Sequence, residues 1–447
     1  MRRWKVLAAL GVMALGVMPA FSAEEGDGST AKWDWFGSLR VRPEYNDNLS
    51  DSFLGRDDKI GYIGYRANIG TQISLDRDVN VLFDVQGLGA AGEDYTPVKG
   101  GSTLDFTFGK LSLYRAYIEA KQVFGEKLDL RLGRQEVVLG DEWLAGDNDF
   151  YGGLSWDAAR ADIGNRWGAL SLVWAKVADF DNPELLTDVS ASEDNTGDWD
   201  FYVLYQSMKF GENVEVDLGV LYNFNHTSLE SIGGPSFIDK RFTYTGRYAY
   251  NPATGFFAKA NAAIQDGRTV DENTLLLQDA NADAFEASLG WRWERNGRTS
   301  KVYGLYADFS GDDPASADVE TFNPLAQDFH NRYGMLDFWN GTWGRTYIGG
   351  APGLRAIQVG FEAEITNGIT LMGVAQRMMR NTEISPTATN KNLGQEFGVA
   401  ARYAYGNNLT LDFCFAQLFP GTAIGNEEPL FGKSTSRRLY VSATAKF

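Results

Sequence analysis

Cysteine and histidine are nearly absent from this chain. Its 447 residues include one cysteine, Cys414, and two histidines, His226 and His330. A single cysteine excludes an internal disulfide, so other contacts must hold the fold. Two histidines leave few candidates for the acid–base chemistry that this side chain performs. The sequence therefore does not favour a disulfide framework or a histidine-rich site.

Long hydrophobic runs are also missing after the first residues. Residues 6–18 (VLAALGVMALGVM) follow a basic start, MRRWK, and precede small residues at Ala20 and Ser22. This run is too short to cross a bilayer, so the pattern predicts a secretory signal peptide over residues 1–22, with a buried N-terminal helix as the alternative. No later run approaches 18 apolar residues. We expect residues 23–447 to form one domain without a membrane helix.

Basic residues are fewer than acidic ones. The chain has 41 Lys and Arg against 59 Asp and Glu, a formal charge of −18 that becomes −21 when Arg2, Arg3 and Lys5 leave with the signal peptide. Such a charge excludes non-specific binding to nucleic acid. Glycine (50 residues) and aromatics (13%) are abundant, whereas hydrophobic content is an ordinary 44%. This composition favours β structure with many tight turns.

Apolar and polar residues alternate along most of the chain. In GYIGYRANIGTQISL, Ile63 and Ile69 fall on one face, and Arg66 and Gln72 fall on the other. A period of two residues is the signature of a β-strand. The alternation predicts eighteen strands, over residues 33–45, 60–76, 78–91, 105–123, 127–139, 154–164, 167–180, 198–210, 213–226, 237–250, 255–266, 282–295, 299–310, 353–366, 368–380, 393–405, 408–419 and 435–447.

The connections between these segments alternate in length. Tight turns such as residues 211–213 and 296–298 alternate with long polar loops such as 181–197 and 311–352. Short periplasmic turns and long extracellular loops are typical of outer-membrane barrels. The sequence therefore predicts an all-β, antiparallel transmembrane barrel of eighteen strands in a Gram-negative outer membrane. A closed barrel satisfies every backbone group within lipid, because it has no free edge.

The end of the chain supports the same interpretation. In RRLYVSATAKF, Leu439 and Val441 share an apolar face that ends at Phe447. A terminal aromatic residue on an alternating strand resembles the signal by which outer-membrane barrels are recognised for assembly. We therefore expect Phe447 to engage the assembly machinery. Aromatic residues near the predicted strand ends, such as Trp33 and Trp293, are expected to meet outer-membrane lipid as interfacial girdles.

Eighteen strands enclose a lumen too wide for wall side chains to fill. The alternation places several arginines from the first six predicted strands on the lumen face. A further arginine, from the third-last strand, is expected to lie near them once the barrel closes. The predicted cationic stripe comprises Arg40, Arg42, Arg66, Arg115 and Arg131, with Arg134 and Arg160 beside them and Arg402 across the closure. Arginine suits carboxylates and phosphates. A merely hydrated wall is the alternative reading.

Four stretches carry a family resemblance. They are LRLGRQEVVLGDEWLAG (residues 130–146), SWDAARADI (155–163), FNPLAQDFHNRYGMLDFW (322–339) and NLTLDFCFAQLFPG (408–421). Together they resemble the alginate-export family of outer-membrane barrels. The resemblance implies an eighteen-stranded barrel that passively exports an anionic polysaccharide through an arginine-rich constriction.

The family's pattern transfers to this chain residue by residue. The matching positions are Arg134 in the GRQ strand, Glu142 in the acidic loop, and Asp157 with the trailing Arg160. Leu154 stands where the family usually has an arginine, and Trp156 replaces its phenylalanine. The missing cation argues against alginate itself, so the predicted solute is a polar anion such as an acidic, alginate-like polysaccharide or oligosaccharide.

Other functions stay open at this point. A general diffusion porin is the main alternative, with lumen charges that only hydrate the wall. A serine hydrolase is disfavoured, because neither histidine lies in a nucleophile motif; His330 is read as a loop-packing residue. Acidic loops near residues 194–200 and 311–313 could bind Ca²⁺, but solvated charge is favoured. We expect no catalytic residue, metal or cofactor.

The loop over residues 311–352 is unusually long. Long loops within compact domains are usually functional. We expect this loop to fold over or into the pore as a lid or constriction.

Overall fold

The computed structural model describes residues 31–47, 59–76, 78–92, 110–179, 197–227, 237–270, 276–313, 315–328, 330–337, 353–383, 389–423 and 435–447. The predicted signal peptide, the strand residues 105–109, the acidic residues 194–196 and the loop residues 338–352 lie outside these ranges. Within them, no helix is long and apolar enough to cross a membrane.

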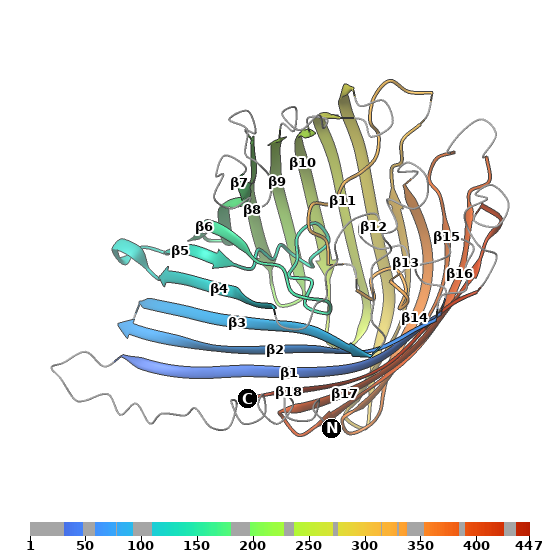
Figure 1. Ribbon diagram of the computed structural model, residues 1–447, viewed down its shortest axis with the longest axis horizontal. Coiled ribbons are helices and arrows are strands. Elements are labelled where there is room, and N and C mark those ends of the chain that lie inside the picture. Colours follow the sequence, from blue (N-terminus) through green and yellow to red (C-terminus); the bar gives the residue numbers. More distant parts are fainter. Residues whose placement is uncertain are drawn as a thin grey trace.

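Eighteen strands form one closed antiparallel barrel (Figure 1). Each strand pairs with its sequence neighbours, and β1 (Lys32–Asp47) also pairs with β18 (Ser436–Lys446), which closes the sheet. The strands between them are β2 (Lys59–Asp76), β3 (Val79–Gly92), β4 (Lys110–Ala120), β5 (Leu128–Gln135), β6 (Trp156–Gly164), β7 (Gly168–Asp179), β8 (Gly197–Phe210), β9 (Val214–Thr227), β10 (Phe237–Tyr250), β11 (Gly255–Val270), β12 (Leu277–Arg295), β13 (Arg298–Phe309), β14 (Leu354–Thr366), β15 (Ile369–Met379), β16 (Asn392–Tyr405) and β17 (Leu409–Pro420).

The predicted fold class and the alternation of short and long connections are confirmed. Short turns join β8 to β9 and β12 to β13, whereas long segments join β5 to β6 and β13 to β14. Three described boundaries differ from the prediction by more than three residues. β12 begins at Leu277, before the expected residue 282, β11 extends to Val270 instead of ending at residue 266, and β5 ends at Gln135 instead of reaching residue 139.

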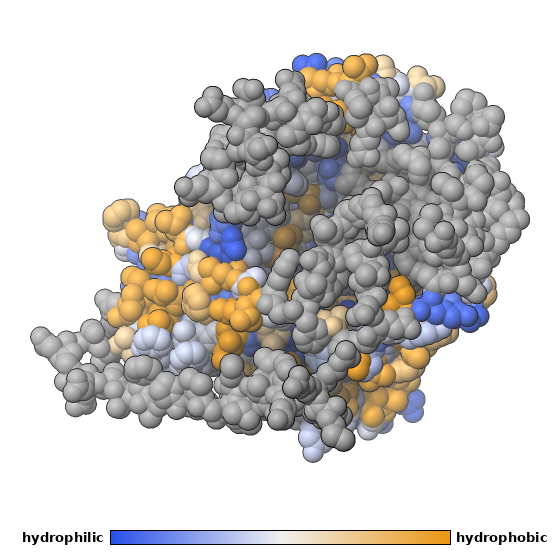
Figure 2. Space-filling model, viewed as in Figure 1, coloured by the Kyte–Doolittle hydropathy of each residue, from blue (hydrophilic) through white to orange (hydrophobic). Residues whose placement is uncertain are grey.

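The alternation of side chains sorts the two faces of the wall. On β1, Leu39 is 46% exposed on the outer face, whereas Arg42 is 7% exposed on the inner face. Hydrophobic side chains cover much of the outer surface that is visible between the grey segments (Figure 2). Aromatic residues are exposed near the short-turn end, including Trp33 and Trp293. This outward apolar band with aromatic ends is the surface that lipid requires.

A hydrophobic core occupies the long-loop end of the barrel interior. Trp143 and Tyr333, from two different loops, are each 2% exposed, and inward wall residues such as Phe201 pack with them. Cys414 is a buried free thiol on the inner wall, as its alternation predicts. The loops therefore fill part of the lumen that eighteen strands would otherwise leave open.

Candidate solute path through the barrel

Two long connections enter the barrel and meet inside it. They are the β5–β6 loop (residues 136–155) and the β13–β14 loop, of which residues 310–313, 315–328 and 330–337 are described; these residues pass through the interior in Figure 1. Ala145 and Ala326 form a parallel bridge between the two loops. The Gly146 amide donates to the Ala326 carbonyl at 2.8 Å, and the Ala326 amide donates to the Leu144 carbonyl at 3.0 Å. The two loops therefore form one joined insert.

The β5–β6 loop folds inward because its sequence is apolar where a surface loop would be polar. Val137 and Leu139 are 1% and 5% exposed, and both belong to the interior core. The chain turns at Gly140, which has a φ of +56°, a left-handed conformation that glycine adopts without strain. The predicted strand over residues 127–139 is thus wrong at its end, because residues 136–139 leave the wall to join this core.

The predicted inward folding of the β13–β14 loop holds for its described residues. Glu396, fully buried on β16, accepts the amides of Met335 and Leu336 at 2.5 and 2.9 Å. Gln376 donates to the other Glu396 oxygen at 2.9 Å and to the Tyr333 carbonyl at 2.7 Å. A buried carboxylate that accepts several hydrogen bonds positions the backbone of the loop.

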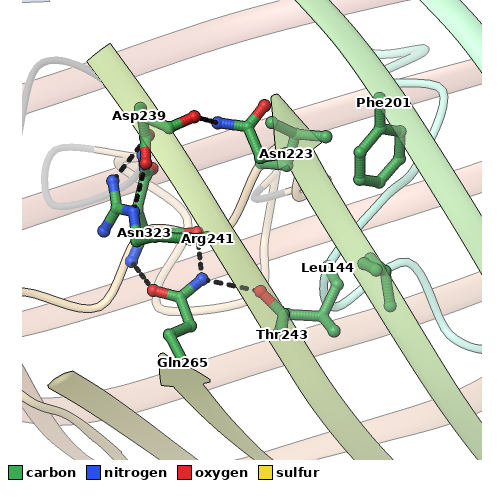
Figure 3. A pocket seen from close by; sticks show the side chains of 10 residues that line it. Leu144, Phe201, Asn223, Asp239, Arg241, Thr243, Gln265 and Asn323 are labelled. Atoms are coloured by element: carbon green, nitrogen blue, oxygen red, sulfur yellow. Dashed lines mark hydrogen bonds and ion pairs between the residues drawn. The ribbon is translucent and has the colours of Figure 1, made fainter. Parts of the chain in front are cut away.

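The same loop is fastened to β10 and β11 by paired amides (Figure 3). Gln265 donates to the Asn323 carbonyl at 2.8 Å, and the Asn323 amide donates to the Gln265 side-chain oxygen at 2.9 Å. Gln265 also donates to Thr243 at 3.0 Å. Arg241 is held by Asp239 at 2.5 Å and donates to the loop backbone. These contacts use polar wall residues for anchoring, so they are not free to meet a solute.

Arg332 connects the two loops to the wall. Its guanidinium lies 3.1 Å from Glu286 on β12 and 3.4 Å from Asp141 in the β5–β6 loop. Lys259 also pairs with Asp141, at 2.6 Å. Burial opposes ionisation of Asp141, but Lys259 and Arg332 outweigh it and lower its pKa to about 2. The two cations therefore stabilise the charged form of the Asp141 carboxylate.

Aromatic packing joins the loops on the opposite wall. Phe150 stacks on His330, with ring centroids 3.3 Å apart, and the His330 ring contacts Asp337 at 2.6 Å. Arg438 on β18 donates to Asp337 at 2.9 Å. Burial would raise the pKa of Asp337, but His330 and Arg438 lower it to about 2. His330 thus packs the loop, as the sequence predicts.

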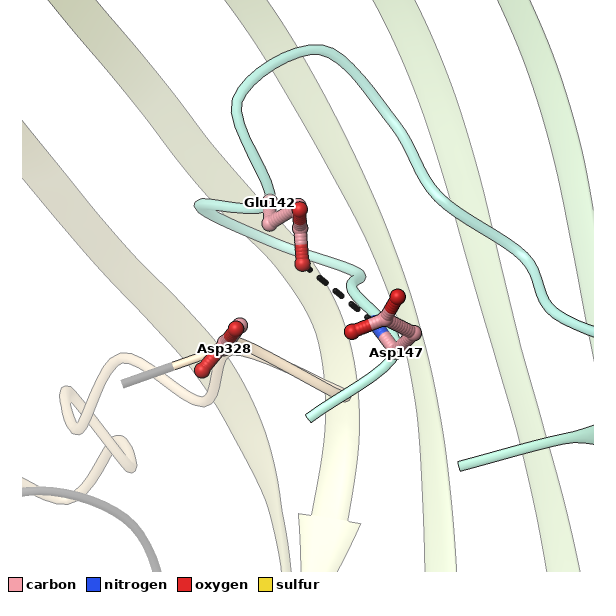
Figure 4. Close-up of side chains that lie close together, drawn as sticks. All are labelled: Glu142, Asp147 and Asp328. Carbon is pink, nitrogen blue, oxygen red and sulfur yellow. Dashed lines mark hydrogen bonds between the residues drawn. The ribbon is translucent and has the colours of Figure 1, made fainter. Parts of the chain in front are cut away.

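Three carboxylates gather where the loops meet (Figure 4). Glu142, Asp147 and Asp328 each offer an oxygen within 4.8 Å of the others. Burial, and then Asp147 and Asp328, raise the pKa of Glu142; burial, and then Asp149, raise that of Asp147. The predicted site residue Glu142 thus lies at the junction of the two inward loops.

The acidic residues 311–313, which the sequence offered as a possible Ca²⁺ site, have another role in the loop. Asp312 and Asp313 accept backbone amides of their own loop.

Three predicted arginines are covered by the β5–β6 loop. Arg40 donates to the Phe150 carbonyl at 2.5 Å, and Arg42 lies over the Phe150 ring at 4.2 Å while it pairs with Glu44 at 2.9 Å. Arg66 pairs with Asp149. These guanidiniums gather on neighbouring strands as the sequence predicts, but they hold the loop in place.

Four other predicted cations have carboxylate partners on the wall. The pairs are Arg115 with Asp84 (2.8 Å), Arg131 with Glu119 (2.6 Å), Arg160 with Asp162 (2.8 Å) and Arg402 with Asp412 (2.7 Å). Arg402 is separated from β1 by β17 and β18, so closure does not bring it into the cluster around Arg40. The predicted stripe is neutralised along most of its length.

Arg134 and Asp157 lie on the other face of the wall. Arg134 is paired in the ladder with Ala116, whose other neighbour is Phe83, 48% exposed on the lipid side. Arg134 and Asp157 form a bidentate pair at 2.9 and 2.6 Å. The prediction that Arg134 and Asp157 line the solute path is therefore wrong. Neighbouring residues of a strand point to opposite faces, and both side chains lie one residue away from an inward position. Gln135, which is fully buried, occupies the inward position.

An open cavity lies away from the predicted arginine stripe, against strands β9–β16, between the β13–β14 loop and the short-turn end of the barrel. Its volume is about 470 Å³. Its charged lining has five cations and three carboxylates: Arg247, Lys259, Arg292, Lys301, Arg332, Glu215, Glu286 and Glu362. The alternation of the sequence places Arg247 and Arg292 on the inner face, and the same pattern could have placed Lys259 and Lys301 there. The sequence did not indicate that these residues line an open cavity, because only the tertiary fold shows which part of the wall the loops cover.

Arg292 differs from the other cavity cations. It donates to the Pro252 carbonyl at 2.7 Å and to Asn251 at 2.9 Å, and lies 5.3 Å from the Phe257 ring. No carboxylate pairs with it among the residues that the structure describes. Lys301 lies directly opposite in the ladder and pairs with Glu362 at 2.8 Å. Like charges that face each other across strands are unfavourable unless an anion compensates them.

Comparisons with known proteins agree with this architecture. A family model described as "Alginate export" matches residues 45–437. No curated protein matches the chain.

Similar solved structures cover almost the whole chain. A BenF-like porin from Pseudomonas fluorescens Pf-5 has 14% identity and a TM-score of 0.56, over 93% of this chain and 98% of that one. Acinetobacter baumannii OccAB4 has 12% identity and a TM-score of 0.56 over the same shares. Pseudomonas aeruginosa OccK2 (OpdF), in complex with glucuronate, has 16% identity and a TM-score of 0.52, again over 93% and 98%. The chain therefore shares the fold of outer-membrane porins.

Proposed function

Because the chain belongs to the alginate-export family, we propose that it is a passive outer-membrane channel for acidic saccharides and other small polar anions. The cationic excess in the cavity carries this proposal. A wall with more cations than carboxylates favours the entry of anions, provided that no site binds them too tightly to release. Arg292 supports it further, because its forked donors suit a carboxylate and no described carboxylate pairs with it.

The cavity also suits a sugar ring. Its volume of about 470 Å³ falls within the roughly 300–1,000 Å³ of small-molecule sites. Phe257 and Tyr303 line it near Arg292, and aromatic rings give apolar contact beside the polar groups that orient a ligand. The glucuronate complex of OccK2 concerns that protein alone, but a uronate is the chemistry that a cationic, partly aromatic cavity would accept.

Solute enters this cavity, in our proposal, along the wall that the inward loops leave open. Arg40, Arg42 and Arg66 would hold the β5–β6 loop that borders this path, and Arg115, Arg131, Arg160 and Arg402 would serve as paired wall charges. Export behind a signal peptide over residues 1–22 and recognition of Phe447 by the assembly machinery complete the proposal.

A general diffusion porin is the second candidate. The observation that favours it is the pairing of Arg115, Arg131, Arg160 and Arg402 with carboxylates. A locally neutral wall would discriminate weakly between anions and cations.

Planar-bilayer and liposome-swelling measurements distinguish the two candidates. We expect the native channel to prefer anions and to admit glucuronate faster than glucose. Replacing Arg292 and Lys301 by glutamine should lower both preferences about threefold or more, because the substitution leaves Glu362 unpaired in the cavity. Arg402→Gln is the matched control, since Arg402 is inward but outside the cavity lining. A native channel that prefers cations, or admits both sugars equally, would establish the diffusion porin instead.

A further inference from the structure

Several charged side chains lie on the outer face, close to the long-loop end of the barrel. Lys240 on β10 and Arg268 on β11 are direct partners in the ladder. Both side chains point outward. Arg241, one residue from Lys240, and Gln265, three residues from Arg268, lie on the opposite face of their strands and are buried inside. Arg134 and Lys176 occupy outward positions on β5 and β7. We call Lys240 and Arg268 the outer cation pair.

The outer cation pair lies just beyond a row of aromatic side chains. Tyr222 and Phe242 are stacked with ring centroids 4.3 Å apart, and Tyr202 stacks on Tyr222 at 6.1 Å. Lys240 is the next outward residue after Phe242 towards the long loops. Aromatic girdles mark the boundary between hydrocarbon and headgroups. The pair is therefore at the depth of the headgroups in the leaflet that faces the long, extracellular loops.

The charges of the outer cation pair are poorly compensated. Lys240 lies 4.9 Å above the Phe224 ring, and no carboxylate within the described residues pairs with it. Arg268 pairs with Asp279, its ladder partner on β12, at 3.3 Å, but both side chains are more than 60% exposed, so this ion pair is weak. Asp266 is the nearest outward acid along the strand from Arg268. By contrast, Arg134 has a bidentate carboxylate partner and Lys176 contacts Asp198 and Asp200.

Two like charges directly across a ladder are unfavourable unless something compensates them. A phosphate would do so, because the terminal guanidinium nitrogens of Arg268 and the ammonium of Lys240 could both reach one phosphate group. We propose that the outer cation pair binds a phosphate on the headgroup of lipopolysaccharide in the outer leaflet. Basic side chains at a membrane surface recognise anionic headgroups in the same way. This site is independent of the solute path, because it lies on the opposite face of the wall.

The test uses the full-length protein, purified in detergent and titrated with diphosphoryl lipid A in the presence of EDTA, with native mass spectrometry as the readout. Lys240→Gln combined with Arg268→Gln should weaken binding about tenfold or more. The single variant Lys240→Gln should give an intermediate loss, and Lys240→Arg should retain binding. Heat-modifiable migration on gels verifies that each variant is folded.

The matched control is Arg295→Gln with Arg298→Gln, another pair of like charges that are ladder partners, at the short-turn end. This control should bind lipid A as the native protein does. Equal binding by the outer-pair variants and the native protein would overturn the proposal. So would equal native affinity for diphosphoryl and dephosphorylated lipid A, or binding that disappears in EDTA, since the contact would then require a bridging metal.

Discussion

Arg438 is a buried side chain that contacts both inward loops. It is 5% exposed and pairs with Glu44 on β1 at 2.9 Å and with Asp337 in the β13–β14 loop at 2.9 Å. It also donates to the hydroxyl of Tyr151 in the β5–β6 loop at 3.2 Å. One buried cation thus joins the wall to both loops. Its removal would take one charged partner from each of two buried carboxylates, leaving Glu44 with Arg42 and Asp337 with His330.

We expect Arg438→Gln to destabilise the protein by roughly 3–5 kcal/mol, the usual cost of breaking a buried ion pair from one side. Chemical unfolding in detergent should measure the loss, and protease cleavage within the inward loops should accelerate. Arg437→Gln is the control, because Arg437, the neighbour of Arg438 on the chain, is half exposed and lies 3.7 Å from Asp47. This longer, partly exposed pair should contribute at most about 1 kcal/mol. Equal effects of the two substitutions would contradict this account.

Glu142 makes the junction of the loops sensitive to pH. Its pKa is raised by burial and then by Asp147 and Asp328. A raised carboxyl pKa means that loop docking is most stable below the ordinary value of about 4.3 and weakens as the pH rises through the raised value. Glu142→Gln should therefore slow hydrogen exchange of residues 315–328 at pH 7, with no effect at pH 4. Glu126→Gln, in an exposed short turn, is the control. Faster exchange in Glu142→Gln at pH 7 would contradict a repulsion between Glu142 and its two carboxylate neighbours.

The β13–β14 loop contacts the wall at widely separated strands. Its described residues are anchored at β10, β11, β12, β16 and β18, and it lies against the β5–β6 loop through the Ala145–Ala326 bridge. Such distributed anchoring favours a fixed constriction over a freely moving lid, because several buried contacts would have to break together.

Replacing residues 311–352 by a short Gly-Ser linker should raise single-channel conductance several-fold, since the loop occupies lumen that ions would otherwise cross. The same linker in place of residues 228–236, another long connection, provides the control and should leave conductance nearly unchanged. An unaltered current after the first replacement would show that the loop does not constrict the channel.

The whole barrel depends on the pairing of its first and last strands. The Gly37 amide donates to the Phe447 carbonyl at 2.9 Å, and the Phe447 amide donates to the Gly37 carbonyl at 3.0 Å. The Phe447 side chain lies over Gly37, where a β-carbon would approach the ring within 2.4 Å. Glycine is therefore required for this close approach at the closure.

Phe447→Ala should reduce the fraction of heat-modifiable, folded protein in outer membranes, because the assembly machinery would lose the terminal aromatic residue. Refolding of the same variant from urea into detergent should remain efficient, since the backbone pairing with Gly37 is kept. Lys446→Gln is the control for a change at the same end. Failure of the variant in both assays would assign Phe447 a purely structural role, and normal folding in cells would remove it from assembly.

Much of the architecture was predictable from local patterns. A period of two residues identifies strands such as β2 and β9, and the turn residues between β12 and β13 identify the short connections. The end of β5 was not predictable, because Val137 and Leu139 continue the alternation after the chain has left the wall. Arg134 was placed on the wrong face for a related reason. A strand pattern says which residues share a face, but a family motif does not say which face its arginine occupies.

The sequence by itself determined the barrel, its eighteen strands, the lipid-facing surface and the family, because each of these follows from local periodicity and motifs. The tertiary structure alone decided which part of the lumen the loops leave open. The inward loops cover Arg40, Arg42 and Arg66 and leave open the wall that carries Arg292 and Lys301. Which wall a loop covers depends on packing between residues far apart in the chain, such as Trp143 with Phe322 and Glu396 with Leu336. Such contacts leave no periodic signal in the sequence.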